Sequence, residues 1–210
     1  EDGGIRFAKG TPEALTAVYR DFERIARTER LEFSGMLVAE RIAGKDCVPH
    51  QLLLSLRQDP SFGPVVFCGL GGVGTEVYKK SLTRDKGLLI RAASDVERRG
   101  DTEAALEKTF FYPVVAGRTR ISRTPLLETD KIHDALASFA ELGRAFSALS
   151  HDSPVTIEEL EVNPLQITPD GELIPLDALM RISGTKHDPA PPPTAGIARL
   201  LKPESALIIG

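Results

Sequence analysis

The chain has 210 residues, of which 41% are hydrophobic and 27% are charged, and its formal net charge is −4. Such a composition is typical of a globular protein with enough apolar residues for one large or two small cores. It excludes a membrane-spanning protein, because no run of residues approaches the roughly 20 apolar positions that a span needs. The mild acidity also argues against a surface that binds nucleic acid.

Cysteine usage and the first residues indicate the compartment. Cys47 and Cys68 form no Cys-x-x-Cys pair, and residues 1–4 are acidic and polar, unlike a secretory signal peptide. Free, buried thiols in a reducing compartment are the simplest interpretation. We therefore expect a cytoplasmic protein.

The first part of the chain predicts a strand, a helix and a second strand. Residues 5–8 favour a short strand. Residues 11–28 predict an amphipathic helix, with Thr11 as N-cap, Pro12 at the first helical position and apolar side chains at helical spacing. Residues 35–42 have the composition of a buried strand.

Two further strands are expected over residues 51–56 and 64–68, and two helices after them, one beginning at Asp101 and one over residues 130–149. The second helix has an apolar stripe at helical spacing, which is typical of packing against a core. Consecutive hairpins followed by helices indicate an antiparallel sheet with helices on one face, which is an α+β fold.

A glycine-rich stretch, Gly69-Leu70-Gly71-Gly72-Val73-Gly74, follows the strand at residues 64–68. Glycines let a backbone turn tightly and bring its amides against a phosphate. The spacing matches neither the P-loop nor the dinucleotide-binding fingerprint. A plain turn and a phosphate cradle therefore both fit this stretch.

The composition changes after Ile182. Residues 183–199 are polar and rich in proline, which indicates an extended linker. Residues 200–210 form a new apolar run that ends in glycine, as the first strand of a nucleotide-type βαβ unit does. We therefore expect a folded domain over residues 1–182, then the linker, and then the first strand of a second domain.

The stretch from Glu158 to Asp177 is the strongest candidate for a functional site. Two β-type runs flank the turn at residues 168–171 (Thr-Pro-Asp-Gly), which predicts a hairpin. Glu161 and Asn163 are two residues apart and so project from the same face, and Asp177 can lie opposite them. Two carboxylates and an amide oxygen suit Mg²⁺ bound to phosphates better than zinc or iron. A polar edge hairpin with its acidic face in water is the alternative.

Four blocks occur in a fixed order: residues 35–42, residues 59–66 (Asp-Pro-Ser-Phe-Gly-Pro-Val-Val), Gly69-Leu70-Gly71-Gly72 with Glu76, and Glu161-Val162-Asn163-Pro164 with Asp177. Together they resemble the ATP-grasp domain of the NDP-forming (ADP-forming) acyl-CoA synthetases, relatives of the succinyl-CoA synthetase β-subunit. The resemblance spans residues 1–182 and implies an ATP-grasp fold with a partial amino-terminal lobe. Residues 200–210 look like the opening strand of the family's CoA-binding domain.

The resemblance implies roles for single residues. Asn163 and Asp177 match positions that hold Mg²⁺ on the nucleotide phosphates, and Glu161 matches an acidic catalytic position that faces a visiting phosphohistidine. The matches to nucleotide-binding positions are a hinge against adenine (Glu40, Arg41, Ile42 and Ala43), a residue near the ribose or phosphates (Gln51), and the glycine loop with its following acid (Gly71, Gly72 and Glu76).

By this resemblance the chain is part of an ADP-forming acyl-CoA ligase, in which a phosphoryl group passes from an acyl phosphate to a histidine and then to ADP. Mg²⁺ and ATP or ADP are the implied cofactors, and CoA would bind through the further domain. The implied partners are CoA-binding and ligase domains of the same protein or of a partner subunit. Neither nucleic acid nor a membrane is implied, and the formation of a homo-oligomer stays open.

The sequence also departs from the family pattern. Gln51 stands where the family usually has glutamate, and Ser55 stands where it usually has glycine. The family's nucleotide-binding lysine comes before a Gly-Gly-Val that residues 3–5 resemble, and no histidine here has the flanking glycines of a phosphohistidine loop. We therefore expect the isolated chain to be inactive. The alternative functions are a nucleotide-sensing module, or a structural ATP-grasp module fused to CoA-binding and acyltransferase domains.

Overall fold

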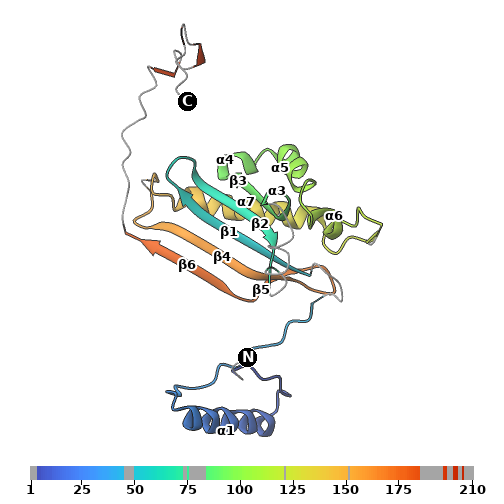
Figure 1. The fold of residues 1–210 in the computed structure, drawn as a ribbon, viewed down its shortest axis with the longest axis vertical. Coiled ribbons are helices and arrows are strands. Elements are labelled where there is room, and N and C mark those ends of the chain that lie inside the picture. The colour runs from blue at the N-terminus through green and yellow to red at the C-terminus, as the bar shows by residue number, and fades with distance from the viewer. Residues whose placement is uncertain are drawn as a thin grey trace. The chain divides into compact units, whose positions relative to one another are not determined.

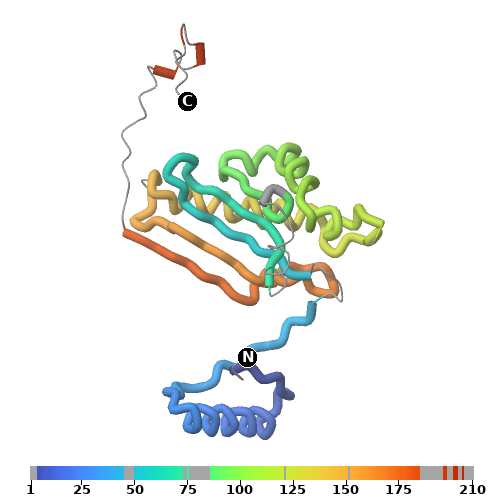
Figure 2. Tube along the Cα trace, viewed as in Figure 1, coloured from blue at the N-terminus to red at the C-terminus, as the bar shows by residue number. Residues whose placement is uncertain are grey.

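The structure is a computed structural model. It describes residues 4–44, 50–72, 75, 84–120, 122–150 and 152–184, together with positions 196–197, 201–202 and 205. The chain divides into two compact units, Glu1–Arg41 and Ile42–Gly210, which can be followed along the trace in Figure 2.

The first unit is built on one helix, α1 (Pro12–Glu29), as the sequence predicts. The Thr11 hydroxyl accepts a hydrogen bond from the Ala14 amide at 3.3 Å, which satisfies one of the free N–H groups at the helix start. Arg30 ends the helix in the left-handed conformation, with φ of 56°. The capping signals at both ends therefore explain the boundaries of α1.

The strands expected in the first unit are not formed, so these two predictions were wrong. Residues 5–8 and 35–42 belong to no strand. The side chain of Leu37 is 93% exposed and that of Val38 is 58% exposed. A strand needs a neighbouring strand to bond its N–H and C=O groups, and residues 4–41 contain none. The apolar composition of residues 35–42 gave no information about that missing partner.

The second unit is built on a six-stranded sheet in which every pairing is antiparallel. The strands run in the order β3-β2-β1-β4-β5, and β6 also pairs with β4 (Figure 1). The N-terminal part of β4 pairs with β6 and its last residues pair with β5. The bounds of the strands are β1 (Gln51–Asp59), β2 (Gly63–Leu70), β3 (Leu88–Ala92), β4 (Thr156–Ile167), β5 (Leu173–Pro175) and β6 (Ala178–Ser183).

The helices of the second unit pack on one face of this sheet. The longest, α7, runs over Thr129–Ala145 and packs against β1 and β2, while α4 packs against α7, β2 and β3. The shorter helices are α3 (Arg84–Gly87), α4 (Ala93–Val96), α5 (Arg99–Leu106) and α6 (Tyr112–Val115). The predicted α+β architecture with helices on one face is therefore confirmed. The predicted start of α5, at Asp101, was two residues late, because the helix begins at Arg99. The predicted end of α7, at residue 149, was four residues too far, because the helix ends at Ala145.

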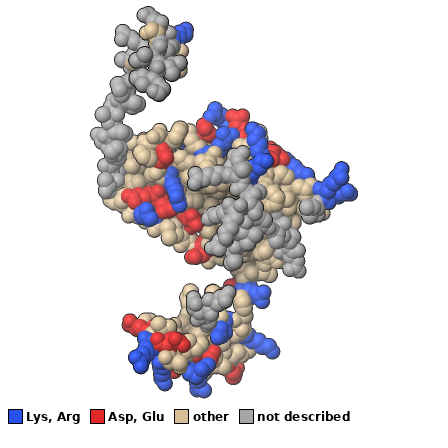
Figure 3. All heavy atoms as spheres, in the orientation of Figure 1, with Lys and Arg blue, Asp and Glu red and all other residues tan. Residues whose placement is uncertain are grey.

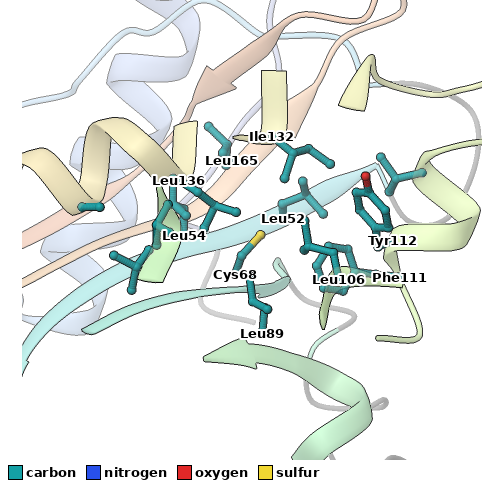
Figure 4. Packing of buried hydrophobic residues seen from close by; sticks show 14 of the residues in the cluster. Leu52, Leu54, Cys68, Leu89, Leu106, Phe111, Tyr112, Ile132, Leu136 and Leu165 are labelled. Atoms are coloured by element: carbon teal, nitrogen blue, oxygen red, sulfur yellow. The ribbon is translucent and has the colours of Figure 1, made fainter. Parts of the chain in front are cut away.

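The core lies between the sheet and these helices (Figure 4). Alternate side chains of β1 point into it, namely Leu52, Leu54 and Leu56, and they meet Leu136 and its neighbours on α7. Gly143 allows the close approach of α7, because a Cβ at this position would lie 2.6 Å from Leu56 Cδ1 and 2.8 Å from Pro64 Cβ. The alternation leaves the intervening side chains of β1 on the opposite face of the sheet.

Cys68 is buried in this core as a free thiol. Burial raises the pKa of Cys68 to about 12, which keeps it uncharged and chemically unreactive. Cys47, the central part of the predicted linker (residues 185–195) and most of residues 200–210 lie outside the described residues. Within the described part of the chain, no helix has the length and apolar character needed to cross a membrane.

His133 is expected to make the stability of the second unit depend on pH. Its side chain on α7 is 6% exposed, and its Nε2 has no hydrogen-bond partner in the part of the chain that the structure describes. Burial, followed by the nearby Arg99 guanidinium, lowers the pKa of His133 below its ordinary value, against the opposing charges of Glu103, Asp130 and Asp134. Near pH 6.5 the unfolded chain therefore binds more protons at His133 than the folded chain does.

The free energy of unfolding should therefore decrease as the pH falls from neutral through 6.5, until the folded-state pKa of His133 is reached. Urea denaturation of the wild type and of His133→Leu at several pH values between 5.5 and 7.5 measures this dependence. The leucine variant should show a smaller decrease in this range. Identical pH dependence in the two proteins would show that His133 does not contribute to it.

Candidate functional site

The face of the sheet opposite α7, which we call the open face, carries a series of polar side chains. On β1 these are Gln51 and Ser55, which alternate with the core leucines. On β4 they include Glu161, which is the direct cross-strand neighbour of Ser55. The β1–β4 register shifts between Leu52 and Leu54, which inserts an extra β4 residue after Val162. The irregularity falls at Asn163 and Pro164, between Val162 and Leu165.

Asn163 joins the glycine stretch to Glu161. The backbone N–H of Gly72 donates to Asn163 Oδ1 at 2.9 Å. The Asn163 amide in turn donates from Nδ2 to Glu161 Oε1 at 3.3 Å. These two contacts fix which end of the amide is the oxygen, and a carbonyl oxygen that accepts one hydrogen bond still has a second lone pair. Asn163 therefore retains capacity to bind a cation.

Asp177 lies beside Asn163, as expected from the sequence. The backbone N–H of Asn163 donates to the Asp177 carbonyl at 3.1 Å, at the junction between β5 and β6. Leu179 is paired with Glu161, so the positions two residues away, Asp177 and Asn163, belong to the same face. The Asp177 carboxylate is exposed, and its Oδ1 accepts from the Ala178 N–H at 2.8 Å. Asp177, between β5 and β6, and Asn163 on β4 are thus neighbours through a backbone hydrogen bond, with their side chains on the same face.

The two glycines predicted to bind nucleotide lie against β1. A Cβ on Gly71 would be 2.1 Å from the Leu52 carbonyl oxygen, and the Gly71 N–H donates to the Gln51 carbonyl at 3.0 Å. Gly72 has a φ of 70°, and a Cβ there would be 1.8 Å from Gln51 Oε1. Only residues without a side chain fit this approach of the two backbones.

The side chain of Gln51 is held by Gln166. Gln51 Nε2 donates to Gln166 Oε1 at 3.0 Å, and Gln166 Nε2 donates to the His50 carbonyl at 2.9 Å. Gly44 also lies here, since a Cβ on it would be 2.3 Å from Gln166 Nε2. Gln51 is therefore part of a neutral amide pair beside Gly72, and Gln166 is a site neighbour that the sequence reasoning missed.

The remaining predicted nucleotide-binding residues are only partly placed. Glu40 and Arg41 end the first unit, and Ile42 and Ala43 begin the second, all in backbone without strand pairing. Glu76 lies outside the described residues. Their roles as hinge residues and as the acid of the glycine loop stay predictions.

The donor set fits magnesium bound together with phosphates. Among the described residues, no group of three or more His, Cys, Asp and Glu side chains is arranged to hold a metal ion. Asn163 and Asp177 would supply two oxygen ligands, one neutral and one charged. Mg²⁺ is commonly bound through one or two protein carboxylates plus substrate phosphates and water, so it does not require a closed protein cage.

A second group on the open face was not predicted. Glu159 Oε1 lies 2.6 Å from Arg57 Nη2, and Glu159 Oε2 lies 3.3 Å from Arg181 Nη2. These three side chains come from β1, β4 and β6, and Figure 3 shows acidic and basic atoms gathered over this part of the sheet. The period-2 spacing of Glu159, Glu161 and Asn163 could have revealed this group. The partners of Glu159 depend on strand register, which the sequence pattern did not provide.

Comparison with known proteins gives a family match. The model of a family described as the ATP-grasp domain matches residues 1–182. Among curated proteins, the chain is 25% identical over 170 residues to an ADP-forming acetate–CoA ligase of Archaeoglobus fulgidus, covering 80% of this chain and 21% of that protein. It is 27% identical over 173 residues to a trans-feruloyl-CoA synthase from an unknown prokaryotic organism, covering 81% of this chain and 20% of that protein. The chain thus spans about a fifth of the length of these relatives.

Solved structures show the same fold at low sequence identity. Acetyl-coenzyme A synthetase 1 of Ca. Korarchaeum cryptofilum, in complex with coenzyme A and Mg-AMPPCP, has a TM-score of 0.52 and 22% identity, covering 87% of this chain and 69% of that one. In that structure a phosphohistidine segment points towards the nucleotide-binding site. A second structure of the same protein, with coenzyme A and acetyl-coenzyme A, has a TM-score of 0.54 and 22% identity, covering 85% and 69%.

Proposed function

The chain belongs to the ATP-grasp domain family, and on this basis we propose that it binds a magnesium-bound adenine nucleotide on the open face. We further propose that it transfers a phosphoryl group between that nucleotide and a phosphohistidine, as part of an ADP-forming acyl-CoA ligase. Its curated relatives are acyl-CoA-forming ligases and synthases. The acetyl-coenzyme A synthetase with the same fold contains Mg-AMPPCP, coenzyme A and a phosphohistidine segment.

The observation that carries this proposal is the meeting of Gly72, Asn163 and Asp177. Asn163 accepts a hydrogen bond from the Gly72 amide through its side chain and donates one to the Asp177 carbonyl through its backbone. The end of the glycine stretch, the Asn163 side chain and the backbone of Asp177 thereby meet at one point of the second unit. This meeting supports the proposal because a phosphate chain needs a counter-charge, which Mg²⁺ on Asn163 and Asp177 would supply.

Phosphoryl transfer depends mainly on positioning and on neutralising charge, since the transferred group reacts through a loose transition state. Asn163 and Asp177 would hold Mg²⁺, which would neutralise charge on the nucleotide phosphates. Glu161 would accept the ring N–H of the incoming histidine and so orient its phosphorylated nitrogen. The P–N bond breaks and a P–O bond to the terminal phosphate of ADP forms, and the imidazole leaves as a neutral ring that keeps its N–H.

The finer parts of the proposal concern partners and location. Coenzyme A and the acyl group would be handled by CoA-binding and ligase domains, on the same polypeptide or on a partner subunit. The acetyl-coenzyme A synthetase structures that share this fold contain coenzyme A. A cytoplasmic location fits the free, unreactive thiol of Cys68.

A nucleotide sensor is the second candidate. The polar contact next to Gly72 is made by the amide pair of Gln51 and Gln166, which carries no charge. A neutral pair can accept hydrogen bonds from a ribose or donate them to phosphates without supplying the charge of the glutamate expected at position 51. Such a site could bind the nucleotide and transfer nothing.

Isothermal titration calorimetry with Mg-ADP and Mg-ATP, combined with an assay of CoA- and acyl-dependent ATP formation, separates these functions. The protein should be assayed together with its CoA-binding and phosphohistidine-bearing domains. We expect Mg-dependent nucleotide binding and ATP formation. Binding without ATP formation would identify a sensor, and the absence of binding would overturn the proposal in favour of a structural module.

A further inference from the structure

Ser55 is a buried side chain on the open face, and its hydroxyl has no hydrogen-bond partner among the described residues. Its side chain is 3% exposed, and its Oγ neither accepts nor donates a hydrogen bond within the described part of the chain. Leu54 and Leu56 on either side of it point into the core, so Ser55 points to the opposite face. Burying an unpaired hydroxyl costs free energy, which alanine at the same position would avoid.

One of the two cross-strand neighbours of Ser55 has a side chain that can accept a further hydrogen bond. On β2 its cross-strand neighbour is Phe67, whose side chain accepts no conventional hydrogen bond. On β4 its cross-strand neighbour is Glu161. Directly opposed residues in an antiparallel pair have Cβ atoms about 5 Å apart, which is within reach of a serine hydroxyl and a glutamate carboxylate after a side-chain rotation.

Glu161 is held from one side only. Its Oε1 accepts the Asn163 amide at 3.3 Å, and no hydrogen bond to its Oε2 is found among the described residues. On the other strand edge its neighbour is Leu179, which has no donor. Ser55 is therefore the one cross-strand neighbour of Glu161 among the described residues that can donate to this carboxylate through its side chain.

We propose that the Ser55 hydroxyl is a positioning residue that donates to the Glu161 carboxylate when phosphohistidine is bound. Asn163 from one side and Ser55 from the other then fix the plane of the carboxylate, and a remaining lone pair accepts the imidazole N–H. This inference rests on the proposed role of Glu161 in phosphoryl transfer. Ser55 touches neither the phosphoryl group nor the nucleotide, and it acts through Glu161 alone.

Ser55→Ala tests the proposal in the ligase with its phosphohistidine-bearing domain present. We expect kcat for ATP formation to fall about tenfold, as for loss of a hydrogen bond to a charged group. The KM for Mg-ADP should stay unchanged, because Ser55 does not contact the nucleotide. Ser55→Thr keeps the hydroxyl and should restore kcat. The melting temperature of Ser55→Ala should be equal to or above that of the wild type, because the variant loses only an unpartnered buried group.

A double-mutant cycle with Glu161→Gln identifies the partner. If Ser55 acts through Glu161, then Ser55→Ala should have no further effect on kcat in the Glu161→Gln background. Additive effects, or an unchanged kcat in Ser55→Ala, would overturn the proposal.

A readout without turnover separates this inference from the proposed function. The ¹³C chemical shift of the Glu161 side-chain carboxylate, with imidazole phosphate added as a small analogue of phosphohistidine, should differ between the wild type and Ser55→Ala. An unchanged shift would overturn the inference even in an active ligase. A changed shift in a protein without nucleotide-dependent transfer would support the contact and count against the proposed function alone.

Discussion

Asp177→Ala is expected to abolish magnesium-dependent phosphoryl transfer in the ligase, with kcat falling by about a hundredfold or more. The variant removes the one charged ligand of the proposed pair and leaves Asn163, whose amide oxygen is neutral. The fold should remain intact, because the Asp177 carboxylate is exposed and, among the described residues, accepts only from the adjacent Ala178 amide at 2.8 Å. The backbone carbonyl that pairs with Asn163 is kept in the alanine variant.

The measurement is single-turnover transfer from the phosphorylated protein to Mg-ADP, with the free Mg²⁺ concentration varied. Asp134→Ala is the matched control, since Asp134 is also an exposed aspartate of the same unit but lies on α7, on the opposite side of the sheet. It should leave transfer unchanged. Wild-type rates in Asp177→Ala at every Mg²⁺ concentration would remove Asp177 from the metal site.

Gly71→Ala should both destabilise the second unit and weaken nucleotide binding. The added Cβ would lie 2.1 Å from the Leu52 carbonyl oxygen and 2.4 Å from its carbonyl carbon, which are backbone atoms of β1. Backbone atoms in a paired strand cannot rotate away as a side chain can, so β1 or the glycine stretch must shift. Overpacking of this kind costs about 1–3 kcal/mol of the free energy of unfolding.

The same shift would displace Gly72, whose N–H donates to Asn163 Oδ1, so the affinity for Mg-ADP should fall by at least about tenfold, equivalent to roughly one misplaced hydrogen bond. Chemical denaturation and calorimetry measure the two effects. Gly100→Ala is the control, because Gly100 lies in α5 with nothing within 4 Å of an added Cβ. Alanine there should stabilise the protein slightly, by about 0.5–1 kcal/mol. Normal stability and affinity in Gly71→Ala would contradict the close packing of this glycine.

Parts of the second unit could be predicted well from the sequence, namely those in which the local residue pattern indicates both a strand and the neighbour with which it pairs. The strands at β1 and β2, the hairpin of β4 and β5, and the position of Asp177 beside Asn163 follow from period-2 patterning and the turn at residues 168–171. The strand β6 was not anticipated, although it pairs with most of β4. Its side chains are largely exposed, so it lacks the alternation of buried and exposed positions that marks a strand.

The site was predictable as a set of residue types and less so as a set of contacts. Glu161, Asn163, Gly71 and Gly72 were identified from motifs, but the amide pair of Gln51 with Gln166 depends on the β1–β4 register. The same holds for the ion pairs of Glu159, which join three strands. Long-range register is set by packing and by irregularities such as the shift between Leu52 and Leu54, which no local pattern encodes.

The central position of β4 has a consequence for how the protein folds. The hydrogen bond between Gly72 and Asn163 joins residues 91 positions apart, and that between Gln51 and Gln166 joins residues 115 positions apart. Pairings between residues so far apart in sequence form slowly, because the entropy of closing a long loop is lost before the contacts contribute any stabilising energy. The proposed nucleotide site can therefore form only after the last strands have joined the sheet. A chain released during synthesis before β4 emerges would have β1 and β2 but no site, so nucleotide binding should report completed folding of the whole sheet.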